Sequence, residues 1–436
     1  MDNPPSESDM PRHQRNLVDL CFEESHYQSA IDVLAQLRSP HHRPAAAHIR
    51  QLLFIALYDA SPDTQIDPTA SPSKRQKRYL LPPVTATRSA QQLLVSFATT
   101  NSPSAVISTL RPTDPDPSDE ETECFIATES LCISRCKNCW EILAEGFLGR
   151  SQPLFASPSR KGKQRDTRSS FSDVRAPVGE MAWPTLDWLL ILFERDELEN
   201  PVLPRHSPLL LEQLGSPSRR DTDGPLNIII HSLQESDPRR RMMGSRLLNL
   251  LINLSGTTHL DFVMLVVSLF NRVSSLEDMS WLMSGLSPTP AIFKFKVALF
   301  QKYFSSNSDG AKIGVRPRPQ ARAPPKGASE TKAREPVSLV NKYRAPSSAD
   351  ILRLLDAKDS SISIPVSPLR IKFELLVSYN AFQTDAPAAE RDPEWPNLLK
   401  NGAIAKALDT TFGCRGGTGG DGTMYRDLLD NILEVY

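Results

Sequence analysis

The sequence lacks a long hydrophobic run. Its most apolar stretch lies within Phe262–Phe270, well short of the roughly 20 residues that a membrane-spanning helix needs. We therefore expect no membrane partner. The first residues are polar and include two prolines, which is not the pattern of a secretory signal peptide. These features together predict a soluble, intracellular protein.

The sequence also lacks an excess of charge of either sign. It contains 50 Lys+Arg and 51 Asp+Glu, for a formal net charge of −1. A chain with this balance has no overall field that would draw it onto nucleic acid or an anionic membrane. Any contact with nucleic acid must come from local basic segments, and we expect such contact to be weak.

Familiar catalytic motifs are absent. The sequence contains no Gly-x-Ser-x-Gly, His-Glu-x-x-His or Walker pattern, and no group of carboxylates can be assigned to acid–base chemistry. We therefore expect a protein that is not an enzyme and has no catalytic residues, cofactor or metal.

Cysteine is scarce, with six in 436 residues, which excludes a disulfide framework. Three of the six are Cys132, Cys136 and Cys139 in "LCISRCKNCW". Their Cys-x3-Cys-x2-Cys spacing resembles that of radical S-adenosylmethionine enzymes. This resemblance implies an iron–sulfur cluster and gives one alternative, an iron–sulfur or radical-type enzyme. That family has an aromatic residue before its last cysteine, whereas this sequence has Asn138.

A packed helix is the interpretation that we favour for the same segment. Ser118 and Glu121 form a Ser-x-x-Glu capping box, and Gly149 is a plausible helix end. On one helix from 118 to 149 the three cysteines would share a face with other apolar side chains. Because free cysteine packs as a small apolar group, this pattern predicts three buried sulfurs and no cluster.

The pattern of hydrophobic residues predicts a mainly α protein, with a helical bundle or short α-solenoid-like core. The 37 prolines and the 39% hydrophobic content indicate long disordered loops rich in Pro, Ser and Arg between the helices. The expected divisions are an N-terminal helical hairpin region (1–60), a mostly disordered linker with a basic cluster (61–117), the cysteine-bearing helix (118–149), a disordered basic linker (150–182), a central helical core (183–304), a disordered basic Pro-rich linker (305–347) and a C-terminal helical region with a Gly-rich tether (348–436).

Helix start signals are clearest in the central core. Asp237-Pro238 and Thr289-Pro290 each place proline at a first helical position, and Ser275 is a capping residue. A further helix is expected from His259 to Val273. The predicted buried residues are Leu247, Leu250, Leu251, Leu254, Phe262, Leu265, Val266 and Leu269.

Near the N-terminus, "FEESHYQSAIDVLAQL" resembles the middle of a tetratricopeptide repeat, with Tyr27, Ala30 and Ile31 at packing positions. No second copy follows at that family's period, so we predict a generic helical hairpin.

Serine followed by proline occurs nine times. At Ser71, Ser157, Ser216 and Ser367 a basic residue stands two places after the proline. This Ser-Pro-x-Lys/Arg pattern resembles sites of cyclin-dependent kinases, so we predict these four serines as phosphorylation sites and a proline-directed kinase as a partner.

One of these sites precedes a basic cluster that has the form of a nuclear import signal, formed by Lys74, Arg75, Lys77 and Arg78. We therefore expect a nuclear regulatory or scaffold protein that binds protein partners through helical surfaces and is recognised by an import receptor. Roles in the cell cycle, development or transcription regulation fit this pattern. The first alternative to this function is a helical subunit of a transcription, chromatin or DNA-repair complex, and the iron–sulfur enzyme is the second.

Overall fold

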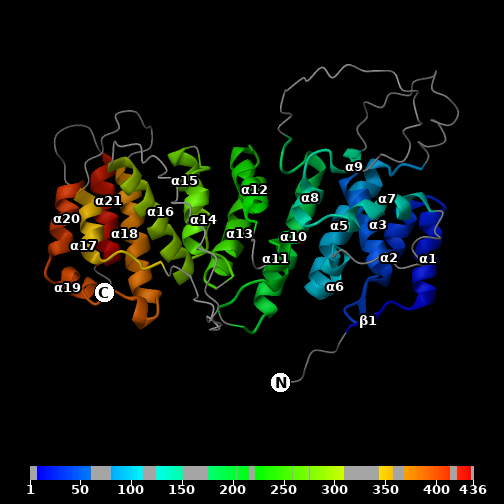
Figure 1. Ribbon diagram of the computed structural model, residues 1–436, viewed down its shortest axis with the longest axis horizontal. Helices are drawn as coiled ribbons and strands as arrows, with labels where there is room; N and C mark the ends of the chain where they lie inside the picture. The colour runs from blue at the N-terminus through cyan, green and yellow to red at the C-terminus, as the bar shows by residue number, and fades with distance from the viewer. Residues whose placement is uncertain are drawn as a thin grey trace, which may run out of the picture. The chain divides into compact units, whose positions relative to one another are not determined.

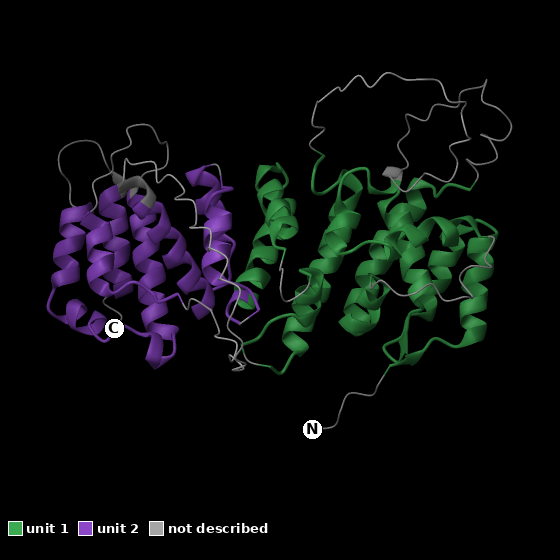
Figure 2. Ribbon diagram, in the orientation of Figure 1, with its two compact units in different colours: residues 1–254 green, residues 255–436 purple. Residues whose placement is uncertain are grey.

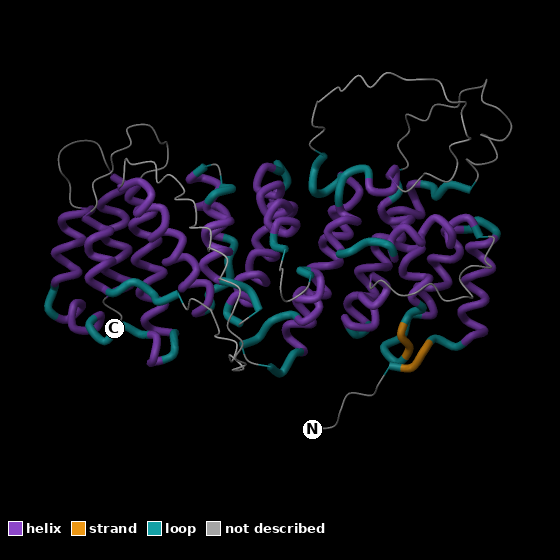
Figure 3. The backbone as a smooth tube through the Cα atoms, viewed as in Figure 1, coloured by secondary structure: helices purple, strands orange, loops and turns teal. Residues whose placement is uncertain are grey.

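The computed structural model describes residues 7–59, 80–110, 124–150, 175–202, 204–215, 221–257, 259–273, 275–308, 343–356, 368–412 and 420–433. Within them the backbone is mainly α-helical, which confirms the predicted fold class (Figure 3). Strands in these ranges are limited to β1 (Ser8–Asp9) and β2 (His42–Arg43), which pair in parallel.

The chain divides into two compact units, Met1–Leu254 and Ser255–Tyr436 (Figure 2). The boundary falls within the range 183–304 that we expected as one core. No described helix is both long and apolar enough to cross a bilayer.

The first unit contains the helices from α1 to α13, the last of which ends one residue past the boundary (Figure 1). In chain order they are α1 (Arg12–Glu23), α2 (Tyr27–Leu37), α3 (Ala46–Leu57), α5 (Val84–Thr100), α6 (Pro103–Ile107), η1 (Ser108–Leu110), α7 (Phe125–Ser134), α8 (Cys139–Leu143), α9 (Phe147–Arg150), η2 (Glu180–Ala182), α10 (Trp183–Glu199), α11 (Pro208–Gln213), α12 (Asp223–Gln234) and α13 (Pro238–Ser255).

Helix α3 is the core of the first unit. It packs against α5, α7 and η1, and every residue from His48 to Leu57 is buried. Its sequence is apolar on nearly all sides, as expected for a helix enclosed by others. The predicted hairpin is present as α1 packed on α2, and the turn between them places Ser25 at a φ of 59°.

The second unit contains α14 (Phe262–Phe270), α15 (Leu276–Ser284), α16 (Pro290–Ser308), α17 (Ser348–Asp356), α18 (Pro368–Asp385), η3 (Ala388–Glu390), α19 (Trp395–Lys400), α20 (Ala403–Phe412) and α21 (Gly420–Leu433). Helix α16 packs against α14 and α18, and α18 packs in turn against α21.

Helix starts in the second unit follow the capping residues in the sequence. The Ser275 side chain accepts a hydrogen bond of 3.0 Å from the Asp278 N–H, which confirms the predicted start of α15. Helix α16 begins at Pro290 as predicted. The expected start at His259 was too early, because Asp261 caps α14 by accepting from the Met264 N–H.

The predicted buried residues are buried with one exception. Leu247, Leu250, Leu251, Leu254, Leu265, Val266 and Leu269 are each at most 5% exposed. Phe262 is only partly buried, because it lines an apolar groove. Its ring centroid lies 5.0 Å from that of Tyr343, which lines the same groove.

Candidate functional site

The cysteine segment is not one helix, so the predicted continuous helix from 118 to 149 is wrong. Helix α7 ends at Ser134 and α8 begins at Cys139. The break is made by Asn138, whose side-chain oxygen accepts from the N–H groups of Trp140 (3.2 Å) and Glu141 (3.3 Å). Asparagine with extended backbone is a strong N-cap, and this local signal outweighed the helical period. Ser118 and Glu121 lie outside the described residues.

The sulfurs are nevertheless packed among other side chains. Cys139 is fully buried and Cys136 is 6% exposed, whereas Cys132 is more accessible. The Cys139 N–H donates to Gln213 Oε1 (2.8 Å), and the Trp140 indole N–H donates to the Gln213 carbonyl (3.2 Å). These contacts hold α8 against α11.

Burial also sets the protonation of these thiols. It raises the pKa of Cys136 to about 12 and the pKa of Cys139 well above its usual value. Among the described residues, no group of three His, Cys, Asp or Glu is placed to hold a metal ion.

The predicted import signal and phosphorylation sites lie outside the described residues. This holds for Lys74, Arg75, Lys77 and Arg78, and for Ser71, Ser157, Ser216 and Ser367.

Two of the other Ser-Pro pairs, at Ser102 and Ser207, stand at the starts of helices. Ser207 caps α11 by accepting from the Leu210 N–H (3.1 Å), and its hydroxyl donates to Asp196 (2.6 Å). Ser102 precedes α6, and its hydroxyl donates to Glu7 (3.0 Å). In both pairs proline occupies the first helical position. Neither has a basic residue two places after the proline.

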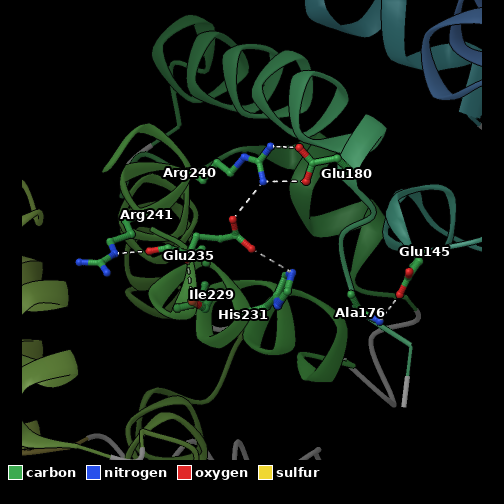
Figure 4. Close-up of polar contacts among 9 residues, drawn as sticks. Glu145, Ala176, Glu180, Ile229, His231, Glu235, Arg240 and Arg241 are labelled. Atoms are coloured by element: carbon green, nitrogen blue, oxygen red, sulfur yellow. Dashed lines mark hydrogen bonds and ion pairs between the residues drawn. The ribbon is translucent and has the colours of Figure 1, made fainter. Parts of the chain in front are cut away.

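A polar cluster that sequence reasoning missed joins η2, the end of α12 and the start of α13 (Figure 4). Arg240 forms ion pairs with Glu180 and with Glu235, the latter at 3.0 Å. Its guanidinium carbon lies 5.2 Å from the Trp183 ring centroid, and the same ring stacks on His231 at 5.7 Å. An arginine shared between two carboxylates and an aromatic ring anchors helices. The "RRR" at 239–241 gave no sign of these distant partners.

A second polar set ties α13 to α10. Arg246 pairs with Asp187 and with Glu194, the latter at 2.7 Å. Asn253 donates to Glu197 Oε1 at 2.7 Å, but burial dominates at this carboxyl and raises the pKa of Glu197. Together with the Arg240 cluster, these contacts position the helices.

The second unit has an apolar groove, formed by α14, α16 and Tyr343. Its cavity measures about 180 Å³ and is lined mainly by Phe262, Val263, Val266, Val267, Ala298 and Tyr343. The Tyr343 hydroxyl donates to Gln301 Oε1 (2.9 Å), and burial raises the pKa of Tyr343. Of the lining residues, Val263 is 36% exposed, and its neighbour Met264, which does not line the groove, is 60% exposed.

This groove could have been found in part from the sequence. The stretch "FVMLVVSLF" is apolar at nearly every position, more than one buried face of a helix requires. The excess indicates an apolar surface left outside the core. The contribution of Tyr343, which is far from α14 in the sequence, was not predictable from local pattern.

Comparison with known proteins does not assign the chain to a family. No protein-family model matches it, and the search of curated proteins finds no match.

Proposed function

We propose that the chain is a non-catalytic regulatory or scaffold protein of the nucleus that binds other proteins through helical surfaces. The observation that supports the protein-binding part of this proposal is the groove of the second unit. Apolar side chains of α14 and α16 line it together, and Val263 is partly exposed to solvent, as in the apolar grooves that receive partner helices.

The occupant of the groove is the apolar face of a partner helix. Two helices, α14 and α16, form its walls, and a groove of this kind receives a third helix whose anchors recur every three to four residues. Gln301, Lys302 and Ser305 give one edge the polar character that surrounds apolar binding centres.

The nuclear and regulatory parts of the proposal rest on the sequence. Ser102 and Ser207 show that some Ser-Pro pairs serve as helix starts, and these pairs lack the following basic residue. The four Ser-Pro-x-Lys/Arg sites differ from these two pairs in the following basic residue, and that residue supports the kinase interpretation. Position at a helix start does not distinguish them, because α18 begins at Pro368, directly after Ser367. The cluster at Lys74–Arg78 supports recognition by an import receptor.

The groove is tested with Val263→Asp/Met264→Asp in the full-length protein. Met424→Asp is the matched control, because Met424 is a 49% exposed methionine in the same unit, on α21. Nuclear proteins that purify with the wild type and the control, but not with the double variant, are then titrated as pure components. We expect binding to weaken at least about tenfold, or about 1.4 kcal/mol, in the double variant only.

Equal binding by the wild type, the double variant and the Met424→Asp control would show that the groove does not bind the partner. Stoichiometric iron with a charge-transfer band in anaerobically purified protein would support the iron–sulfur alternative. Capture that depends on DNA or RNA and is lost at high salt would support the chromatin or repair subunit.

A further inference from the structure

Helix α1 presents two leucines to solvent on the side opposite its packed face. Leu17 is 50% exposed and Leu20 is 51% exposed, whereas Val18 and Phe22 on the inner side are buried. Helix α1 is the outermost helix of the first unit, and it packs inward on α2 and α7 (Figure 1). The orientation of the helix is fixed, because Asp19 accepts a hydrogen bond from the buried His48 side chain on α3 at 2.8 Å.

Charges of opposite sign lie at the two ends of this leucine face. Arg12 and His13 are exposed in the first turn, and Glu23 and Glu24 are exposed at the end. At about 100° per residue, His13, Leu17, Leu20 and Glu24 form one stripe, and Arg12 and Glu23 lie along the same flank of it. Within the described chain, Arg12, His13 and Glu23 form no ion pair.

We propose that α1 pairs antiparallel with α1 of a second copy of this chain. A two-fold axis between Leu17 and Leu20 sets Leu17 against Leu20 of the second copy. The same axis places His13 opposite Glu24 and Arg12 beside Glu23, once at each end. A two-fold interface must be complementary to itself, and this face has that property. Parallel pairing would instead set like charges against each other.

The dimer is weak and salt-sensitive. One helix pair buries less than the roughly 1,200 Å² of standard interfaces, so association takes place in the micromolar range or above. Glu24 also contacts His26 of its own chain at 3.3 Å, and this exposed pair contributes little and exchanges readily. This self-association is separate from the groove on α14 and α16.

The test uses sedimentation velocity of the full-length protein up to about 100 µM, where a micromolar dimer is populated. An acidic variant carries Arg12→Glu/His13→Glu, and a basic variant carries Glu23→Lys/Glu24→Lys. Both changes suit the helix dipole, which favours acidic groups at the start and basic groups at the end, so α1 stays intact. Leu198→Asp is the control, because Leu198 is an exposed leucine on α10.

The wild type and the control should dimerise with rising concentration, and dissociate in about 1 M salt, where the screening length is about 3 Å. Each charge variant alone, and Leu20→Asp, should be monomeric. An equal mixture of the acidic and basic variants should form a dimer again. A wild type that is monomeric throughout, a dimer that survives Leu20→Asp, or a mixture that stays monomeric would each overturn the proposal.

Discussion

Leucines on α13 and on α1 look alike in the sequence but differ in the structure. Leu247, Leu250 and Leu251 on α13 are at most 2% exposed, whereas Leu17 and Leu20 on α1 are half exposed. In both helices the apolar residues recur at helical spacing. The periodic pattern therefore identifies a helix and its apolar stripes, but it does not tell which stripe is enclosed. Helix α1 has one stripe for its own core and a second one facing solvent.

The largest expected effect separates these two environments directly. Leu251→Asp puts an unpaired charge in a fully buried position and should cost more than about 4 kcal/mol, enough to unfold the unit. Leu20→Asp should change the free energy of unfolding by no more than about 0.5 kcal/mol. Urea and thermal melts of the two variants check this. A cooperative, wild-type-like melt of Leu251→Asp would mean that the inner stripe of α13 is not a core.

The cysteines provide a smaller contrast of the same kind. Cys139→Ser places a hydroxyl in a fully buried site and should cost about 1–3 kcal/mol. Cys132 is more accessible, so Cys132→Ser should stay within about 0.5 kcal/mol. Chemical denaturation measures both. Equal losses for the two variants would argue that the three sulfurs act as one unit.

Two glutamates on α10 give the smallest effect, with opposite signs. The raised pKa of Glu197 means that the folded state holds its proton more tightly than the unfolded chain. The free-energy cost of burying the ionised Glu197 carboxylate is absent at low pH, where the group is protonated in both states. This cost appears as pH rises from about 4.3, the usual pKa of glutamate, through the raised pKa of the folded state. Glu197→Gln keeps the acceptor for Asn253 and removes this penalty, so it should stabilise the protein at pH 7.

The matched variant is Glu194→Gln, which removes a charge paired with Arg246 and should destabilise at pH 7. Melting curves from about pH 4 to pH 7 compare the two variants with the wild type. Destabilisation by Glu197→Gln at neutral pH would show that its hydrogen bond outweighs its burial.

Local signals in the sequence predicted much of the fold. Capping residues and prolines gave the starts of α13, α15 and α16, because these contacts depend only on neighbours within one turn. The break at Asn138 was also a local signal, but the helical spacing of the cysteines suggested continuity across it. The C-terminal region was predicted to be helical, but its division into short helices such as α19 and α20 was not, since their short apolar patterns gain meaning only from packing against one another.

The candidate sites were less predictable, because they depend on residues distant in sequence. Tyr343 completes the groove of α14 and α16, and Glu180 reaches Arg240 from another helix. Neither contact follows from spacing. The charge pattern of α1 is visible in the sequence, but only the structure shows that it lies on the exposed side.

The proposal of a nuclear regulatory protein depends most on the cluster of Lys74, Arg75, Lys77 and Arg78. The most direct test is imaging of the tagged full-length protein beside a variant with these four residues changed to Ala. The account predicts a nuclear wild type and a shift of the variant toward the cytoplasm, with Ser71→Asp giving a partial shift because it adds one negative charge beside the cluster. A wild type found outside the nucleus, or a variant whose nuclear signal is undiminished, would contradict it.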